Sequence, residues 1–406
     1  MNDATTGQTK RRQLVNDSVG VIGVINAGSS SLKFAFYDGE RRIISGQIDG
    51  LGSQPEARAS GQNGAALEPL DLGREPPTNP SEALTLLLPW TKEMLCGREV
   101  AALGHRVVHG GMGHREPERV TPELLIQLEA LIPLAPLHQA HNLAAIRTAI
   151  DLNPTLPQVA CFDTAFHRNA PEVAQAFALP RELFDGGARR YGFHGLSYEY
   201  IASVLPELAP EIADGRVVVA HLGNGASLCA LDGGTSIAST MGFSVLDGLP
   251  MGTRCGELDP GILIYLLKHK GMSVEGVEDL LYRRSGMLGL SGLSSDFRDL
   301  LASDHPSARF AVDVFCYQTA RHIASMAAAL NGIDGIVFTA GVGENAAPVR
   351  ASISRRCRWL GLELDESANR RHGPRISKVS SRVTAYVFAT DENLMIARHT
   401  RALSTI

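Results

Sequence analysis

Short apolar runs separated by glycine-rich or acidic turns dominate the first part of the chain. Residues 21–25 form an apolar run that enters the hydroxyl-rich turn 26–31 and leaves through the largely apolar stretch 32–37. Two such runs on either side of a tight turn predict a β-hairpin. Residues 216–242 repeat this plan around the glycine-rich turn 221–225. We interpret the two copies as an internal duplication; the alternative is that any two hairpins look alike.

Helical patterns lie between and after the hairpins. Asn79 and Thr121 are N-cap residues, and each is followed by a proline at the first helical position. They predict helices over 83–88 and 124–131. Strands that alternate with helices predict an α/β fold. The remaining candidates are strands over 157–162 and 335–340 and helices over 141–150 and 348–360.

Length and composition predict a globular protein with more than one domain. At roughly 150 residues per domain, the 406 residues correspond to two or three domains. The 44% of hydrophobic and 20% of charged residues are sufficient for large buried cores. Residues 51–78 are rich in glycine, proline and glutamine, and we expect a surface insertion or long loop there.

Charge and cysteine usage argue against several classes of protein. The net charge of −5 leaves no basic footprint for nucleic acid, and no apolar run approaches the ~18 residues of a membrane span. Residues 1–20 carry a basic cluster with no apolar segment after it, which predicts a disordered tail and not a secretory signal. Six cysteines without a CxxC pair favour reduced thiols and a cytoplasmic protein.

Glycine-rich turns after strands are the main sign of a ligand. The turns 26–31, 221–225 and 341–345 each follow a strand candidate, and Gly-rich backbone can approach a phosphate closely. Ser29, Ser31 and Lys33 add hydroxyl donors and one positive charge at the first turn. Three such turns favour a phosphate site over plain loops.

One of these turns has a competing interpretation. Residues 341–346 satisfy G-x-G-x-x-A, and Glu363 or Asp365 follows about 20 residues later. This spacing is typical of a dinucleotide-binding oxidoreductase. The interpretation explains one turn and leaves the other two without a role.

Two arginines, an aspartate and a histidine are the candidates for chemistry. Arg106 and Val108 alternate onto one face of a strand, so a guanidinium lies beside an apolar wall, as a small carboxylate would need. Arg254 lies in the glycine-bracketed loop 250–260; its alternative role is a structural salt bridge to Glu257 or Asp259. Asp163 follows a strand, where open α/β sheets place ligands. A lone histidine such as His194 is more often a core residue.

Together the motifs closely resemble the acetate kinase family, in order from residue 21 to the C-terminus. The matching segments are VINAGSSSLKF (24–34), GHRVVHGG (104–111), FDTAFH (162–167), RRYGFHG (189–195), AHLGNG (220–225), MGTRCGELDPG (251–261), SSDFRDL (294–300), FTAGVGEN (338–345) and TDENLMIAR (390–398). Nine ordered matches are highly specific.

The resemblance implies a fold and an activity. The expected fold is two similar ribonuclease-H-like domains of the actin-like ATPase type with a nucleotide cleft between them. We expect residues 21–163 with 395–406 as the acyl-substrate domain and 164–394 as the nucleotide domain. The implied activity is reversible, Mg²⁺-dependent transfer of the ATP γ-phosphoryl group to acetate, with Mn²⁺ as an alternative ion and a homodimer as the assembly.

The resemblance also implies roles for individual residues. Asp163, His194 and Arg254 would be catalytic, and Asn26 and Glu392 would hold the metal. The implied acyl-substrate residues are Arg106, Val108, Leu137, Phe193 and Val245. The implied nucleotide contacts are Ser29, Ser31, Lys33, His221, Leu222, Gly223, Asn224, Gly225, Asp296, Phe297, Arg298, Gly341, Val342, Gly343, Glu344 and Asn345.

Physical chemistry questions one implied role, and the chain departs from the family pattern in places. A carboxylic acid with a pKa of ~4 to 5 is ionised at neutral pH, so acetate needs no general base and Asp163 could orient metal or substrate instead. HGTSH of relatives becomes HGLSY at 194–198, and Val245 replaces a proline, which leaves propionate as a second acceptor. The non-enzymatic alternative, an actin-like assembly protein, would have no use for Arg106, Arg254 and Glu392.

Overall fold

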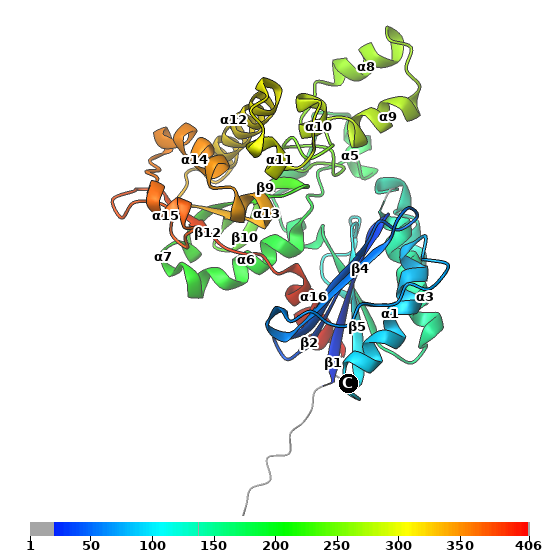
Figure 1. Cartoon of the computed structure of the whole chain (residues 1–406). Coiled ribbons are helices and arrows are strands. Elements are labelled where there is room, and N and C mark those ends of the chain that lie inside the picture. The colour runs from blue at the N-terminus through cyan, green and yellow to red at the C-terminus, as the bar shows by residue number, and fades with distance from the viewer. Residues whose placement is uncertain (1–19, 137, 405–406) are drawn as a thin grey trace, which may run out of the picture.

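A computed structural model describes residues 20–136 and 138–404, and within these ranges two β-sheets are covered by helices (Figure 1). The predicted α/β class is confirmed. The first sheet has the strand order β4-β3-β2-β1-β5-β7-β6. Its strands are β1 (Val21–Ala27), β2 (Ser31–Asp38), β3 (Arg41–Asp49), β4 (Glu56–Gly61), β5 (Val100–Val107), β6 (Glu118–Arg119) and β7 (Gln158–Phe162). The predicted tail lies outside the described residues, apart from Gly20.

The second sheet repeats the plan of the first. Its order is β10-β9-β8-β11-β12, and the corresponding strands of the first sheet are β3-β2-β1-β5-β7. In each sheet, neighbouring strands among the first three of this order are antiparallel. The last two strands of this order are parallel to the third strand. The repetition of strand order and direction supports the duplication interpretation over chance similarity of two hairpins. The strands are β8 (Arg216–Leu222), β9 (Ala226–Asp232), β10 (Thr235–Ser239), β11 (Gly335–Thr339) and β12 (Thr384–Val387).

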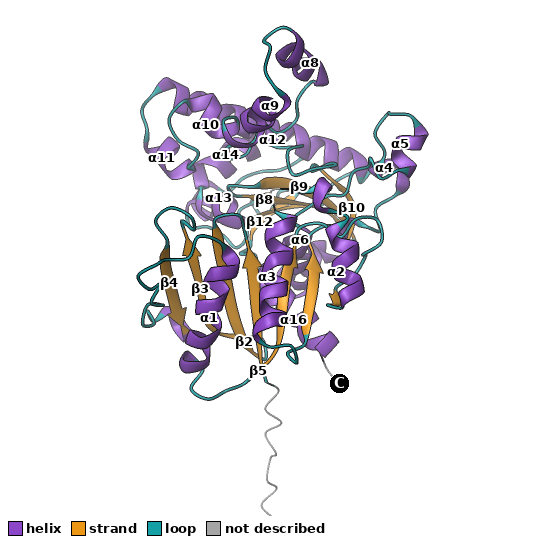
Figure 2. Ribbon diagram, turned by 90° about the vertical axis from the view of Figure 1, so that its right-hand side faces the viewer, coloured by secondary structure: helices purple, strands orange, loops and turns teal. Residues whose placement is uncertain are grey.

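Alternating side chains on β1 build a core on each face of the first sheet. Val21 and Ile25 pack toward α1 (Pro80–Met94) and α3 (Gln139–Leu152), while Ile22 and Val24 pack toward α16 (Glu392–Ser404). Figure 2 shows α1 and α3 in front of this sheet, together with α2 (Pro122–Glu129). Gly104 permits the contact of α16, since a Cβ there would lie 2.2 Å from Thr400 Oγ1. The first residue of α16, Glu392, is held at one end of the sheet.

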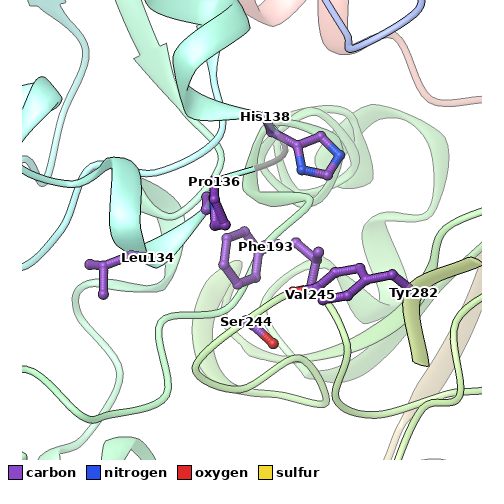
Figure 3. Close-up of a pocket in the computed structure, with 8 residues that line it drawn as sticks. Leu134, Pro136, His138, Phe193, Ser244, Val245 and Tyr282 are labelled. Carbon is purple, nitrogen blue, oxygen red and sulfur yellow. The ribbon is translucent and has the colours of Figure 1, made fainter. Parts of the chain in front are cut away.

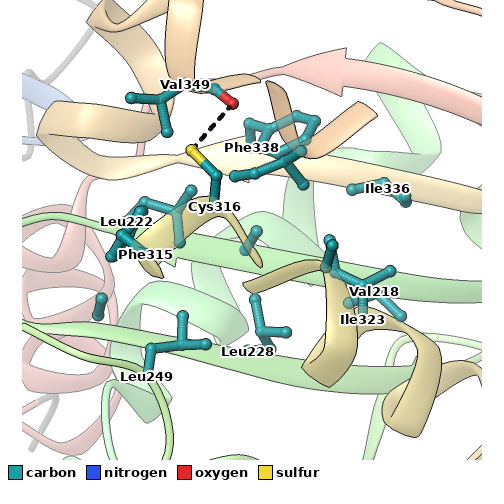
Figure 4. Close-up of a cluster of buried hydrophobic side chains, with 14 of the residues drawn as sticks. Val218, Leu222, Leu228, Leu249, Phe315, Cys316, Ile323, Ile336, Phe338 and Val349 are labelled. Atoms are coloured by element: carbon teal, nitrogen blue, oxygen red, sulfur yellow. Dashed lines mark hydrogen bonds between the residues drawn. The ribbon is translucent and has the colours of Figure 1, made fainter. Parts of the chain in front are cut away.

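The second sheet is sandwiched between α12 (Pro306–Ala329) and α6 (Gly195–Leu208). Val218, Phe338 and Phe315 belong to the α12 side of this core (Figure 4). Val219 and Val337 point to the other face, toward α6. The remaining helices are α4 (Glu172–Gln175), α5 (Arg181–Asp185), α7 (Pro210–Ala213), α8 (Pro260–Lys268), α9 (Val274–Arg283), α10 (Gly286–Ser291), α11 (Phe297–Ala302), α13 (Ala340–Asn345), α14 (Ala347–Arg356) and α15 (Glu366–Arg370).

Most predicted elements are present, and several differ from the prediction. Helix α1 continues past residue 88 to Met94 because Trp90 on its last turns is buried. The expected loop 51–78 contains β4, which pairs with β3, and Leu51 and Leu70 on either side of β4 are buried in the core. The turn 341–345 is helical, as part of α13, and Val108 lies one residue beyond β5. Among the described residues, no helix combines the length and apolarity that a membrane span requires.

The α12 core provides a test of packing. Phe315 is fully buried and packs edge-to-face against Phe297 at 4.7 Å between ring centroids, whereas Phe310 on the same helix is 58% exposed. We expect Phe315→Ala to lower the free energy of unfolding by about 3–5 kcal/mol, and Phe310→Ala to change it by less than about 0.5 kcal/mol. Urea denaturation of both variants measures this, and equal losses would contradict the assigned packing.

Candidate active site

The carboxyl ends of three neighbouring strands bring Asn26, Arg106 and Asp163 together. Strands β1, β5 and β7 are parallel neighbours, so their ends lie at one edge of the sheet. Arg106 Nη1 donates to Asn26 Oδ1 at 3.4 Å, and Arg106 Nε donates to Asp163 Oδ1 at 2.9 Å. Arg106 Nη2 donates to the second carboxylate oxygen of Asp163 and completes a bidentate ion pair.

This ion pair fixes the charge at the sheet edge. Burial raises the pKa of Asp163, whose side chain is 2% exposed, and the Arg106 guanidinium opposes that rise. Burial alone would lower the pKa of Arg106, but the carboxylates of Asp163 and Glu392 outweigh it and raise the pKa. Arg106 therefore stays cationic, and both oxygens of Asp163 are occupied by that cation.

His194 is presented to the cleft by an unusual backbone conformation. It has φ 57°, in the left-handed region, at the residue before α6. The next residue donates its N–H to Asp163 O at 2.8 Å, which ties the loop to the first sheet. The His194 ring stacks on His221 with centroids 4.2 Å apart. Burial, His221, Arg106 and Arg254 hold the pKa of His194 well below its usual range, so the imidazole is neutral.

Arg254 and His194 meet at Gly225. A Cβ on Gly225 would lie 3.1 Å from both Arg254 Nη2 and His194 Nε2. Arg254 Nη1 donates to Val245 O at 2.9 Å, and burial lowers the pKa of Arg254 to about 10. No carboxylate of the described residues forms an ion pair with Arg254.

The alternative structural role for Arg254 is therefore not supported. Glu257 faces Arg321 at 3.9 Å and His322 at 3.5 Å instead, and the carboxylate of Asp259 caps α8 by accepting from Gly261 N at 2.7 Å. The guanidinium of Arg254 is a desolvated cation that lacks a protein counter-ion in the described structure, which suits it to an anionic ligand.

A small pocket is lined by Val245, whose carbonyl oxygen accepts the hydrogen bond from Arg254 (Figure 3 shows the pocket). It encloses about 10 Å³, which is about the space of one water molecule. Phe193 and Val245 line it as expected, whereas Val108 packs in the neighbouring core with Phe193. Leu137 lies outside the described residues. The complete lining is Leu134, Ala135, Pro136, His138, Phe193, Ser244, Val245 and Tyr282.

A much larger pocket, of about 760 Å³, lies against the second sheet. Its volume is typical of sites for organic ligands. Asp296 caps α11 by accepting from Arg298 N at 2.8 Å, and the Arg298 guanidinium lowers the pKa of that carboxyl. Eight of the expected nucleotide residues line this pocket: Gly223, Asn224, Asp296, Phe297, Arg298, Gly341, Val342 and Asn345.

The other expected nucleotide residues do not line this pocket. His221 lies under His194, and Gly225 separates His194 from Arg254. Lys33 pairs with Asn26 across the β1–β2 hairpin, which places it near the sheet edge with Ser29 and Ser31. Leu222 is buried in the α12 core, a Cβ on Gly343 would lie 3.5 Å from Ala220 O, and the Glu344 carboxylate accepts from Thr390 N at 3.3 Å.

Asn26 and Glu392 offer oxygen ligands on the side facing Arg106. The Glu392 carboxylate contributes to the raised pKa of Arg106, and Arg106 in turn donates to Asn26 Oδ1. The described residues contain no group of three or more His, Cys, Asp or Glu side chains able to hold a metal. Mg²⁺ usually binds through one or two carboxylates together with substrate phosphates and waters. An amide and a single carboxylate fit that ion.

Two buried amides on α3 were not anticipated from the sequence. Asn142 accepts from Val108 N at 3.0 Å and donates to Ala27 O at 2.6 Å. Gln139 accepts from His109 N at 3.1 Å and donates back to His109 O at 3.0 Å. These bonds fix the backbone after β1 and β5, so they position Asn26 and Arg106. The available signal was one amide, Asn142, among the apolar positions of the helix predicted over 141–150, whereas Gln139 lies before that predicted helix.

Comparisons with known proteins agree with this geometry. The family model described as "Acetokinase family" matches residues 21–398. The acetate kinase of Rhodopseudomonas palustris (strain ATCC BAA-98 / CGA009) is 52% identical over 388 residues, covering 93% of this chain and 97% of the relative. A propionate kinase from Francisella tularensis has a TM-score of 0.89 at 34% identity, covering 95% of this chain and 100% of the other. The acetate kinase of Porphyromonas gingivalis has a TM-score of 0.85 at 34% identity, covering 95% and 99%.

The family model spans more than nine-tenths of the chain, and the Rhodopseudomonas palustris relative is 52% identical over nearly its whole length. The chain therefore belongs to the acetokinase family.

Proposed function

We propose that the chain is an acetate kinase that transfers the γ-phosphoryl group of ATP to acetate and, in reverse, makes ATP from acetyl phosphate and ADP. The observation that carries the proposal is the convergence of Arg254 and His194 at Gly225, close to a small pocket of about 10 Å³. Arg254 needs an anion that the described protein does not supply. A two-carbon carboxylate and a transferring phosphoryl group satisfy both features.

The residues support phosphoryl transfer without a general base. Acetate, with a pKa of ~4 to 5, is already a nucleophile at neutral pH. Asp163 is bound through both oxygens to Arg106, so we assign it a positioning role and not that of a base. Arg254 and the neutral His194 then stabilise charge that develops on the equatorial phosphoryl oxygens.

The larger pocket is the proposed nucleotide site. Its lining by Gly223, Gly341 and Asn345 brings backbone from two strand ends to one ligand. Asn26 and Glu392 would hold Mg²⁺, or Mn²⁺ in its place, and the ion would neutralise charge on the β- and γ-phosphates. Binding of ATP here directs its terminal phosphate toward Gly225, His194 and Arg254.

We further propose that the two sheets belong to two domains that close on the substrates. The division is 21–163 with 395–406 against 164–394. The first sheet ends with β7, just before Asp163, and the second begins with β8. Helix α16 begins at Glu392 and packs on the first sheet, so it carries the proposed metal ligand from one domain to the other.

The solved relatives include an acetate kinase and a propionate kinase, and the small pocket favours acetate, the shorter acid, as the phosphoryl acceptor. An additional methylene must displace the side chains of Phe193, Val245 or Tyr282, which line the pocket. One methylene in an apolar pocket is worth about 1–3 kcal/mol, or roughly 10- to 200-fold in specificity. Acetate is therefore the proposed main substrate, and propionate the secondary one.

The first prediction concerns the acceptor. With ATP and Mg²⁺, hydroxylamine trapping should give acyl hydroxamate from acetate, with kcat/KM for propionate lower by roughly tenfold or more and butyrate lower again. The measurement compares the three acids at several concentrations. Hydroxamate from none of them would contradict the kinase function, and a preference for propionate would contradict only the pocket assignment.

A second prediction concerns Arg254. Arg254→Ala should lower kcat by about 10²–10³, because removal of one preorganised donor leaves charge in the transition state uncompensated. Arg283→Ala is the matched control, since Arg283 is exposed and pairs with Asp279 at 3.5 Å on the surface of the same domain. Steady-state kinetics of both variants decide the matter. A nearly wild-type Arg254→Ala would show that the guanidinium is structural.

We also propose that the chain works as a homodimer through α8. This helix contributes no buried residue, and its exposed side chains include Ile262, Ile264, Tyr265 and Leu267. Figures 1 and 2 show α8 projecting from the body of the molecule beside α9. An apolar helix in this position is typical of a protein interface.

The test of the dimer is a charge on α8. Ile264 is 54% exposed, and Ile264→Glu should convert a dimer into a monomer in size-exclusion chromatography with light scattering, because a carboxylate would be buried in the interface. Val379→Glu, at an apolar residue that is 90% exposed elsewhere, should leave the mass unchanged. A wild-type monomer, or a dimeric Ile264→Glu variant, would refute the interface.

A further inference from the structure

Two buried hydroxyls lie behind His194, on the side of the ring that faces away from Arg254. Ser227 on β9 places Oγ 2.8 Å from His194 Nδ1. Tyr198 on α6 places its hydroxyl 2.5 Å from the same Oγ. Both residues have 0% exposure, so water does not take part in these contacts. The three groups form one chain from the α6 core to the cleft.

The number of hydrogens determines the direction of this chain. Ser227 is the hydrogen-bond partner recorded for the Tyr198 hydroxyl among the described residues. A buried hydroxyl that donates to nothing is costly, so Tyr198 donates to Ser227. Ser227 Oγ then accepts a hydrogen bond from Tyr198 and donates its single hydrogen to His194 Nδ1. In the opposite order the Tyr198 hydrogen would have no acceptor, and if Ser227 accepted from both neighbours its own hydrogen would have none among the described residues.

The protonation of His194 follows from this order. Nδ1 accepts a hydrogen bond and carries no proton, and a neutral imidazole then carries its proton on Nε2. Nε2 is the atom that would lie 3.1 Å from a Cβ on Gly225, on the same side as Arg254 Nη2. The proton therefore faces the cleft. The groups that pack around the ring, His221 and the cations Arg106 and Arg254, disfavour a second proton.

We propose that Tyr198 and Ser227 are positioning residues that hold His194 as the neutral tautomer with its proton on Nε2, aimed at the transferring phosphoryl group. The part of this statement that names the phosphoryl group rests on the proposed function. The opposite tautomer would turn a lone pair toward the phosphoryl oxygens and repel them. Nothing is covalently transferred to the ring, and the Nε2–H donates one hydrogen bond.

Nitrogen NMR of the whole protein tests the tautomer directly. The protein is labelled with ¹⁵N in its 13 histidines, and the His194 signals are assigned as those lost in His194→Gln. Without substrate, we expect Nε2 to resonate as a protonated nitrogen and Nδ1 as an unprotonated one. A protonated Nδ1, alone or together with Nε2, would overturn the proposal. This result does not depend on enzymatic activity, so it is separable from failure of the proposed function.

Kinetics of two variants test the consequence. Tyr198→Phe removes the hydrogen that sets the order, and Ser227→Ala removes the link itself. One ordinary hydrogen bond is worth about 1 kcal/mol, so we expect kcat to fall by roughly fivefold in Tyr198→Phe and further in Ser227→Ala, with KM for ATP nearly unchanged. The His194 signals should show loss of the single tautomer in parallel.

Tyr386→Phe is the matched control. Tyr386 is another buried tyrosine of the α6 core, and its hydroxyl donates to Glu211 and not to the site. Its variant should keep both kcat and the His194 tautomer. If Tyr198→Phe and Ser227→Ala match this control in both measurements, the positioning role is refuted. If either variant fails to fold, the spectrum of the wild-type protein still decides the tautomer.

Discussion

An unpaired guanidinium in a desolvated cleft is the constraint on which the rest of the account depends. Removing a cation from water is costly unless an anion accompanies it, and the described structure provides Arg254 with a carbonyl oxygen and no carboxylate. Arg106 lies nearby and has its own counter-ion in Asp163. Arg254 therefore has no carboxylate partner among the described residues until an anion enters. Substrates that bring negative charge, such as a carboxylate and a triphosphate, supply that anion.

The strand order that the two sheets share brings the residues of this site together. In each sheet two parallel strands lie beside the first strand of the hairpin, so the carboxyl ends of β1, β5 and β7 meet in one half and those of β8 and β11 in the other. The first set carries the ion pair, and the second leads into the glycine turn 221–225 and into α13. Glycine at 225 allows His194 and Arg254 to approach the same point from different loops. The small pocket is lined by residues from both halves, whereas the larger pocket is lined by the second half.

The elements that depend on neighbouring residues in the sequence were predicted correctly. The hairpins, the N-caps at Asn79 and Thr121 and the strand before Asp163 follow from apolar period and capping chemistry, and the structure confirms them. The edge strand β4 was missed because its sequence is polar and its order comes from pairing with β3.

Contacts between distant residues were beyond the reach of that reasoning. The motifs indicated that Arg106 and Asp163 both mattered, but the sequence could not show that they bind each other, since 57 positions separate them. The bonds of Asn142 to the ends of β1 and β5, and the chain from Tyr198 through Ser227 to His194, are likewise visible only in three dimensions. The sequence motifs identify the residues of the site, but contacts of this kind determine their charge and protonation.

The most direct measurement is a crystal structure of the protein with acetate and a non-hydrolysable ATP analogue. The account predicts the acetate carboxylate between Arg106 and Arg254, its methyl group in the pocket lined by Phe193 and Val245, and the terminal phosphate facing His194 Nε2. Acetate bound away from both arginines, or a nucleotide bound outside the pocket at Gly223 and Gly341, would contradict it.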